Sequence, residues 1–197
     1  SFYNESKNGP IPPSPIVSCL GRFKDVNKAV PAHFQNNDSV ILLIGERKNE
    51  LGGSVYYSLK NELGANVPKP NFEEVKNQIF ALTDCIDSGL VLSCHDIADG
   101  GIASALAEMT FRNSIGCNVN IESNLSPDKI LFSETGGFIL EVLPKNIDTI
   151  KSVFSNYELG VFEIGSTGGE SIQINGITDI FVSEIKKAWT NGLREKL

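Results

Sequence analysis

The chain has few cysteines, no long apolar run and no block of basic residues. No stretch approaches the ~18 consecutive apolar residues that a membrane-spanning helix requires, so we expect no membrane insertion. The lack of a basic block argues against non-specific nucleic-acid binding. The dispersed cysteines form no CxxC pair, which argues against a disulfide framework or a cysteine metal site and favours a reduced, cytoplasmic compartment; they are Cys19, Cys85, Cys94 and Cys117.

The N-terminus also lacks features of a targeting sequence. It begins Ser1-Phe2-Tyr3-Asn4-Glu5, with no Met and with neither the basic region nor the apolar core of a signal peptide. We therefore expect a fragment or a processed chain. Prolines dominate the stretch up to Pro15 and forbid a helix there, so we expect residues 1–15 to be an extended entry segment from a preceding domain.

What remains, residues 16–197, has the composition of one globular domain. The chain of 197 residues is 41% hydrophobic and can bury a core, while its formal net charge is −7. An acidic protein can still bind a phosphorylated small molecule, because backbone N–H groups and a metal ion can supply the positive field.

Apolar runs and helical periodicities alternate along the domain. The unbroken run over 39–44 predicts a strand covered on both faces. We expect further strands at 16–20, 91–95, 116–121 and 138–142, and a hairpin of 162–166 with 171–174. We expect helices over 71–88, 102–112 and 147–157, a short helical turn from Ser126-Pro127 and a final helix with Trp189. The pattern predicts an α+β fold, a mixed β-sheet layered with α-helices.

The helix from Asn71 has the clearest signals. Asn71 can cap it, and Glu74 follows three residues later as in a capping box. Five apolar residues step by three or four along it and predict a stripe that faces the core: Phe72, Val75, Ile79, Leu82 and Ile86.

The first motif with possible chemistry is Leu51-Gly52-Gly53-Ser54, at the start of a short helix. Two glycines permit a tight turn in which successive N–H groups point at an anion. The alternative is an ordinary glycine turn with Ser54 as a helix cap. No Gly-Lys-Ser/Thr follows, so the motif is not a P-loop.

The second motif runs from His95-Asp96 through Asp99-Gly100-Gly101 and joins a strand to a helix. Carboxylates at the carboxyl end of a strand suit Mg²⁺, which prefers oxygen ligands and bridges to phosphate. The alternative is a turn capped by Asp99, with His95 hydrogen-bonded in the core. Cys94 points to the opposite face from His95, so we expect a core cysteine and no Cys–His pair.

The third motif, Phe132-Ser133-Glu134-Thr135-Gly136-Gly137, places Glu134 between apolar residues and a glycine bend. A carboxylate there could hold a metal ion or a ribose hydroxyl, or it could be a solvated turn residue. The sequence assigns no metal ligand beyond these alternatives.

These motifs in this order resemble the phosphoribosylformylglycinamidine synthase (PurL) family, in its C-terminal domain of the AIR synthase (PurM) type. The resemblance covers nearly the whole chain and includes Ser1-Phe2-Tyr3-Asn4-Glu5 and the Pro10–Pro15 stretch. The Ser-Phe-Tyr-Asn-Glu start distinguishes this family from AIR synthase, selenophosphate synthetase and thiamine-phosphate kinase, which remain the alternatives.

The resemblance implies an ATP-dependent ligase of purine biosynthesis, with Mg²⁺ as cofactor. The family converts formylglycinamide ribonucleotide and glutamine-derived ammonia to formylglycinamidine ribonucleotide, together with a glutaminase subunit and a small accessory subunit. It implies that Ser1 contacts substrate. By the family's internal duplication, it implies that Gly52, Gly53, Ser54, Asp96, Asp99 and Glu134 form a second, pseudo-symmetric site.

One departure concerns Gly137, which stands where the family's small form often has Arg. This weakens any expectation of a phosphate-binding arginine at that position. We expect the fragment alone to be inactive, because the ATP-binding barrel and the acid–base residues would belong to other domains. The alternative is a non-catalytic scaffold that docks the partner subunits.

Overall fold

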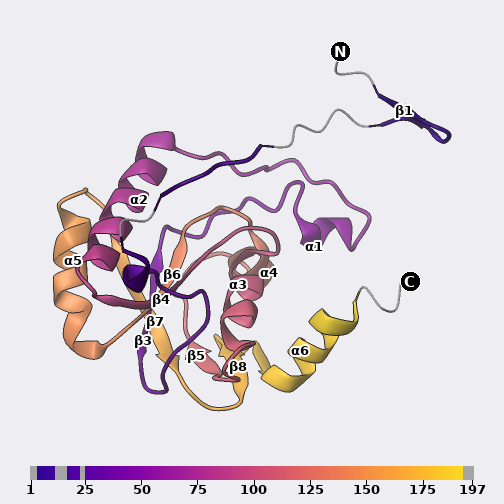
Figure 1. Cartoon of the computed structure of the whole chain (residues 1–197). Coiled ribbons are helices and arrows are strands. Elements are labelled where there is room, and N and C mark those ends of the chain that lie inside the picture. Colours follow the sequence, from indigo (N-terminus) through magenta and orange to yellow (C-terminus); the bar gives the residue numbers. More distant parts are fainter. Residues whose placement is uncertain (1–3, 12–16, 23–24, 193–197) are drawn as a thin grey trace.

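The computed structural model describes residues 4–11, 17–22 and 25–192. Its centre is a seven-stranded sheet in the order β4-β6-β3-β7-β5-β8-β9 (Figure 1). All neighbours pair antiparallel except β5 and β8, which are parallel, so the sheet is mixed as predicted. The strands are β3 Val40–Ile44, β4 Val91–Asp96, β5 Cys117–Val119, β6 Phe138–Val142, β7 Val161–Thr167, β8 Ser171–Ile174 and β9 Thr178–Phe181.

Helices lie on both faces of this sheet (Figure 1). Helices α2 and α5 cover one face, and α3, α4 and α6 cover the other. The helices are α1 Val55–Ser58, α2 Phe72–Asp87, α3 Gly101–Thr110, α4 Pro127–Phe132, α5 Ile147–Ser155 and α6 Val182–Asn191, with 3₁₀ turns η1 Val26–Lys28 and η2 Pro144–Asn146. The predicted α+β class is confirmed.

Strand β3 shows how the layers are specified. Leu42 and Ile44 pack into the core beneath α2 and α5, whereas Ile41 and Leu43 pack into the core beneath α3 and α4. Alternate side chains of a strand point to opposite faces, so a strand buried on both sides must be apolar throughout. The run over 39–44 therefore has the role predicted for it.

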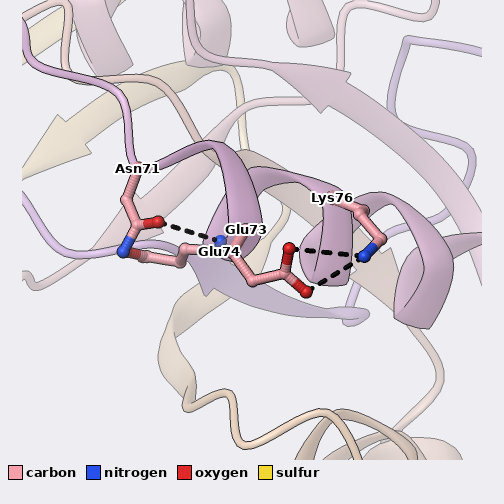
Figure 2. Close-up of polar contacts among 4 residues, drawn as sticks. All are labelled: Asn71, Glu73, Glu74 and Lys76. Atoms are coloured by element: carbon pink, nitrogen blue, oxygen red, sulfur yellow. Dashed lines mark hydrogen bonds and ion pairs between the residues drawn. The ribbon is translucent and has the colours of Figure 1, made fainter.

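The start of α2 also agrees with its sequence signals. The Asn71 side-chain oxygen accepts a hydrogen bond from the Glu74 backbone N–H at 3.3 Å, and Lys76 pairs with Glu73 at 3.0 Å (Figure 2). The Glu74 carboxylate does not close a capping box, because it accepts a hydrogen bond from the Gln78 side chain at 3.2 Å. Asn71 alone caps the helix, satisfying one of its orphan N–H groups.

The apolar stripe predicted for α2 is right in its second half and wrong in its first half. Leu82 is buried and Ile86 packs against the core, whereas Phe72, Val75 and Ile79 are exposed. The buried residues of α2 are Gln78, Ala81, Leu82 and Cys85. Phe72 is 81% exposed and Ile79 is 46% exposed. Both sets of residues have helical spacing, and the small side chains of Ala81 and Cys85 let the helix approach the sheet closely. The first half of the predicted stripe is left on the surface.

Two strand predictions are also wrong. Val17–Leu20 has no regular secondary structure, and Ile16 lies outside the described residues. The segments over 162–166 and 171–174 are strands β7 and β8, but they do not pair as a hairpin, because β5 lies between them. Gly116 enables this insertion: its N–H donates to Gly169 and its carbonyl accepts from Gly168, both at 2.8 Å.

Part of the entry segment predicted over 1–15 can be described. It contains a two-stranded hairpin, β1 Glu5–Ser6 with β2 Gly9–Pro10. Ser1 and residues 12–15 lie outside the described residues, so the division into an entry segment and a domain over 16–197 stays a prediction. Within the described part of the chain, no helix has both the length and the apolar character needed to cross a bilayer.

Candidate functional site

Three loops meet at one edge of the sheet. Strands β3 and β4 both run antiparallel to β6, with Ile44 and Asp96 each opposite Phe138 at its start. The carboxyl ends of β3 and β4 therefore lie beside the segment that precedes β6. All three sequence motifs lie at this edge of the sheet.

Glu134 joins the other two motifs. One carboxylate oxygen, Oε1, accepts hydrogen bonds at 2.9 Å from the N–H of Val55, directly after Ser54, and at 2.9 Å from the N–H of Gly100. We call this arrangement of Glu134, the Gly52–Val55 turn and the Asp96–Gly101 turn the Glu134 junction. The carboxylate is not a free turn residue, because it holds two loops together.

The Gly52–Ser54 turn is closed by bonds within the chain. The N–H of Gly52 donates to Asn66 at 2.7 Å, that of Gly53 to Leu63 at 2.7 Å, and that of Ser54 to Leu51 at 3.2 Å. The Ser54 side chain is buried, donates to Leu51 and accepts from the N–H of Tyr57. In this conformation the turn acts as a helix cap, and its amides have no free N–H for an anion.

Gly100 and Gly101 allow the second turn to pass close to its neighbours. Gly101 has φ +68°, and a Cβ there would lie 2.6 Å from the Leu131 carbonyl oxygen and 2.8 Å from Phe132 Cα. Glycine adopts this left-handed conformation without steric penalty. The start of α3 therefore packs directly against the end of α4, which leads into Ser133 and Glu134.

The two aspartates of the second motif face solvent. The side chain of Asp96 is 67% exposed, and Asp99 is also exposed. Asp99 does not cap α3, whose N-cap is Gly100. Among the residues that the structure describes, the one partner of these two side chains is the His95 ring, 3.5 Å from an Asp96 oxygen.

His95 is held within the fold. Its Nε2 lies 2.9 Å from a carboxylate oxygen of Glu108 on α3, and its Nδ1 lies 2.7 Å from the Asp96 carbonyl oxygen. Cys94 packs on the opposite side of the sheet, against the core beneath α2 and α5. Burial, with a contribution from Asp96, raises the pKa of the Cys94 thiol to about 12. The thiol is therefore no nucleophile at neutral pH.

Arg47 was missed by the sequence reasoning. It follows β3, is only 8% exposed, and donates to the carbonyl oxygens of Ser133 at 3.3 Å and of Gly136. Ser133 donates in turn to the Lys48 carbonyl at 2.6 Å. The available signal was an arginine three residues after a buried strand, in a chain where Gly137 replaces an expected arginine. The Arg47 guanidinium lies 3.5 Å from where a Gly137 Cβ would be.

The donor groups at this edge do not form a metal site by themselves. Among residues 4–11, 17–22 and 25–192, no cluster of three or more His, Cys, Asp or Glu side chains could hold a metal ion. Glu134 already uses Oε1 for two backbone N–H groups. The described residues of this chain therefore do not fit a complete Mg²⁺ site.

Comparison with known proteins identifies the fold family. A family model described as "AIR synthase related protein, C-terminal domain" matches residues 36–175. The chain belongs to this family. Two curated relatives match this chain along nearly its whole length. Both are phosphoribosylformylglycinamidine synthase subunits PurL. The one from Methanothrix thermoacetophila is 34% identical over 100% of this chain and 27% of the relative. The one from Thermoplasma volcanium is 36% identical over 98% of this chain and 26% of the relative.

Solved structures share the fold. Thermotoga maritima PurL complexed with FGAR aligns with a TM-score of 0.71 at 17% identity, over 82% of this chain and 30% of that one. The same protein complexed with ATP, and the structure of PurLQS, align with TM-scores of 0.64 and 0.65 over 82% of this chain and 28% of each of those chains, at 18% and 19% identity. The chain spans about a quarter of the length of the curated relatives it matches.

Proposed function

We propose that this chain is the C-terminal domain of a phosphoribosylformylglycinamidine synthase. The parent ligase would convert formylglycinamide ribonucleotide to formylglycinamidine ribonucleotide, with ATP and glutamine-derived ammonia. ATP would phosphorylate the amide oxygen, and ammonia would then displace phosphate. The observation that carries this proposal is the alignment of the entire chain with PurL relatives at 34% identity.

The domain's own contribution is to hold the loops at this edge of the sheet in position. Glu134 fixes the Gly52–Val55 turn against the Asp96–Gly101 turn through two charge-assisted hydrogen bonds, each stronger than a neutral one. We infer that Glu134, Gly52, Gly53 and Ser54 shape this edge and do not hold ligand directly. Asp96 and Asp99 point to solvent and are the candidates for contact with a ligand or another domain.

ATP and Mg²⁺ would be bound largely by other parts of the parent enzyme. The turn amides of Gly52–Ser54 are paired within the chain, and the described carboxylates make no three-ligand cluster. Mg²⁺, when bound, would supply charge neutralisation at the transferred phosphate. Ser1 would contact substrate if the family's role for this serine applies here, and it lies outside the described residues.

The test compares this chain with a PurL-length polypeptide that contains it. We expect the longer protein to form formylglycinamidine ribonucleotide from formylglycinamide ribonucleotide, ATP and ammonium, and we expect the 197-residue chain alone to show no turnover. Lack of turnover by the longer protein with added ammonium would contradict the ligase assignment. Turnover by the chain alone would contradict the positional role.

A second candidate function is that of a scaffold that docks the glutaminase and the small accessory subunit. The exposed apolar face of α2, formed by Phe72, Val75, Ile79 and Phe80, favours it, because exposed apolar patches commonly mark interaction sites. Isothermal titration tests this second function. Binding of either partner subunit by the chain would support the scaffold, and binding of Mg·ATP by the chain alone would contradict the positional role proposed above. Phe72→Ser should weaken partner binding if the chain is the scaffold.

A further inference from the structure

A buried arginine lies beside the Glu134 junction with part of its hydrogen-bonding capacity unused. A guanidinium carries five N–H donors. Arg47 uses its two terminal nitrogens to reach the carbonyl oxygens of Ser133 and Gly136. Its Nε is buried and has no hydrogen-bond partner among residues 4–11, 17–22 and 25–192. Because Nε is enclosed, the donors left for a ligand are the two further N–H groups of the terminal nitrogens.

The charge of Arg47 is also poorly compensated. Burial lowers the pKa of the Arg47 guanidinium to about 10, and Glu50 is the carboxylate whose charge opposes this shift. The hydrogen bonds of Arg47 go to neutral carbonyl groups, with no carboxylate among them. A cation removed from water in this way gains more from an incoming anion than an exposed cation would.

Arg47 lines a cavity that is large enough for a small molecule. The cavity has a volume of about 730 Å³ and lies between the end of β3, the first half of β7 and the loop over 120–124. We call it the Arg47 cavity. Ligand sites of small molecules typically fall in the same range, about 300–1,000 Å³.

The rest of the lining is suited to hydroxyl groups. Glu46, Glu122, Ser123 and Asn124 are exposed around the cavity and offer carboxylate, hydroxyl and amide groups. Carboxylates that face solvent repel an anion only weakly, because water and salt screen them, but they accept hydrogen bonds readily. The third acidic lining residue, Glu163, is paired with Lys151.

We propose that the Arg47 cavity binds a phosphomonoester that carries hydroxyl groups, with its phosphate at Arg47 and its hydroxyls at the solvent-facing rim. Arginine suits phosphate because its planar N–H fork matches the oxygen geometry. A cationic ligand would be repelled by Arg47, and a fully apolar ligand would leave the polar lining unpaired. The proposal does not rest on the ligase activity, since binding is measured on the chain itself.

The test is isothermal titration of the 197-residue chain with ribose 5-phosphate. Ribose and inorganic phosphate are titrated separately as controls, because they are the two chemical parts of the probe. We expect saturable binding of ribose 5-phosphate at one site and at least about tenfold weaker binding of each part, which corresponds to about 1.4 kcal/mol. No saturation up to about 10 mM would overturn the proposal, because weaker binding is no specific site. Equal affinity for inorganic phosphate would overturn the assignment to a hydroxyl-bearing phosphomonoester.

Two variants and a matched control locate the site. Arg47→Gln should weaken binding at least about tenfold, whereas Arg112→Gln removes the same charge from an exposed residue outside the cavity and should leave affinity within about twofold. Because Arg47 also ties Ser133 and Gly136 together, its loss can impair folding. Asn124→Trp avoids this problem, since Asn124 is exposed and a large ring there fills the cavity. A folded Asn124→Trp chain with unchanged affinity would overturn the proposal.

Discussion

The two sides of the segment Ser133–Gly137 use their polar groups differently. On the Glu134 junction side, Glu134 accepts from two loops, and the amides of the Gly52–Ser54 turn all have partners in the chain. On the Arg47 cavity side, a buried cation keeps unused donors beside about 730 Å³ of open space. The glycine-rich turn and Glu134 form their hydrogen bonds within the chain, whereas a buried polar group without a partner among the described residues, Arg47 Nε, lies five residues before Gly52 in the same connection between β3 and α1.

Burial predicts that Cys94 reacts more slowly than an exposed cysteine with an alkylating reagent in solution. Thiolate is the nucleophile in alkylation, and an increase in pKa from 9.0 to about 12 lowers the thiolate fraction of Cys94 about 700-fold at pH 8.5. Cys19 is exposed. We therefore expect iodoacetamide to label Cys19 at least about 100-fold faster than Cys94, measured by mass spectrometry of the two peptides. Labelling rates within tenfold of each other would show that the β4 edge opens readily.

The same pKa shift has a consequence for stability. Folding raises the pKa of the Cys94 thiol, so the folded state keeps its proton where the unfolded state has lost it. The associated stabilisation is fully present below pH 9 and is lost as pH rises toward 12. Urea unfolding of Cys94→Ala should therefore show a weaker loss of stability above pH 9 than the parent chain shows.

Glu141 extends the comparison to a carboxylate deep in the sheet. It is fully buried and accepts from the N–H of Gln35 at 2.7 Å, from the N–H of Asn36 at 2.9 Å and from the Ser93 hydroxyl at 2.7 Å. Glu141→Ala leaves these donors without an acceptor, so we expect it to lower the free energy of unfolding by about 3 kcal/mol or more.

The matched control for Glu141 is Glu122→Ala at the rim of the Arg47 cavity. Glu122 is exposed, and its removal should change stability by less than about 0.5 kcal/mol. Urea denaturation of both variants gives the comparison directly. Similar losses from both would mean that pairing within the chain does not distinguish the two sides.

Substitution of Glu134 tests the Glu134 junction directly. Glu134→Ala removes the acceptor shared by Val55 and Gly100, and we expect a loss of about 1–3 kcal/mol because both N–H groups are left without an acceptor from the chain. Glu134→Gln keeps a carbonyl oxygen in place and should lose less. Amide hydrogen exchange at Val55 and Gly100 should quicken in the Ala variant. Unchanged exchange at both amides would contradict the role of Glu134 as the link between the loops.

The sequence predicted the strands from their apolar patterns, and only the family resemblance implied that the three motifs lie together. Antiparallel pairing of β6 with β3 and β4 then brought the motifs to one edge. The sequence could not predict that the first half of the α2 stripe stays exposed, because its helical spacing matches that of the second half and only tertiary packing decides which part reaches the core. It could not predict β5 between β7 and β8, because that pairing depends on contacts far apart in sequence. Arg47 was missed for the same reason: its partners Ser133 and Gly136 are remote in the chain.

Asp96 gives the smallest and most discriminating effect. Its side chain is 67% exposed, and its nearest partner is the His95 ring at 3.5 Å, so Asp96→Ala should change the free energy of unfolding by less than about 0.5 kcal/mol. Asp99→Ala, at another exposed position of the same turn, should behave alike. A loss above about 2 kcal/mol would assign Asp96 a structural hydrogen-bonding role. The decisive result would be that both variants keep full stability yet abolish formylglycinamidine ribonucleotide formation in the longer protein. That result would assign the direct role in the reaction to the carboxylates of Asp96 and Asp99, and not to Glu134.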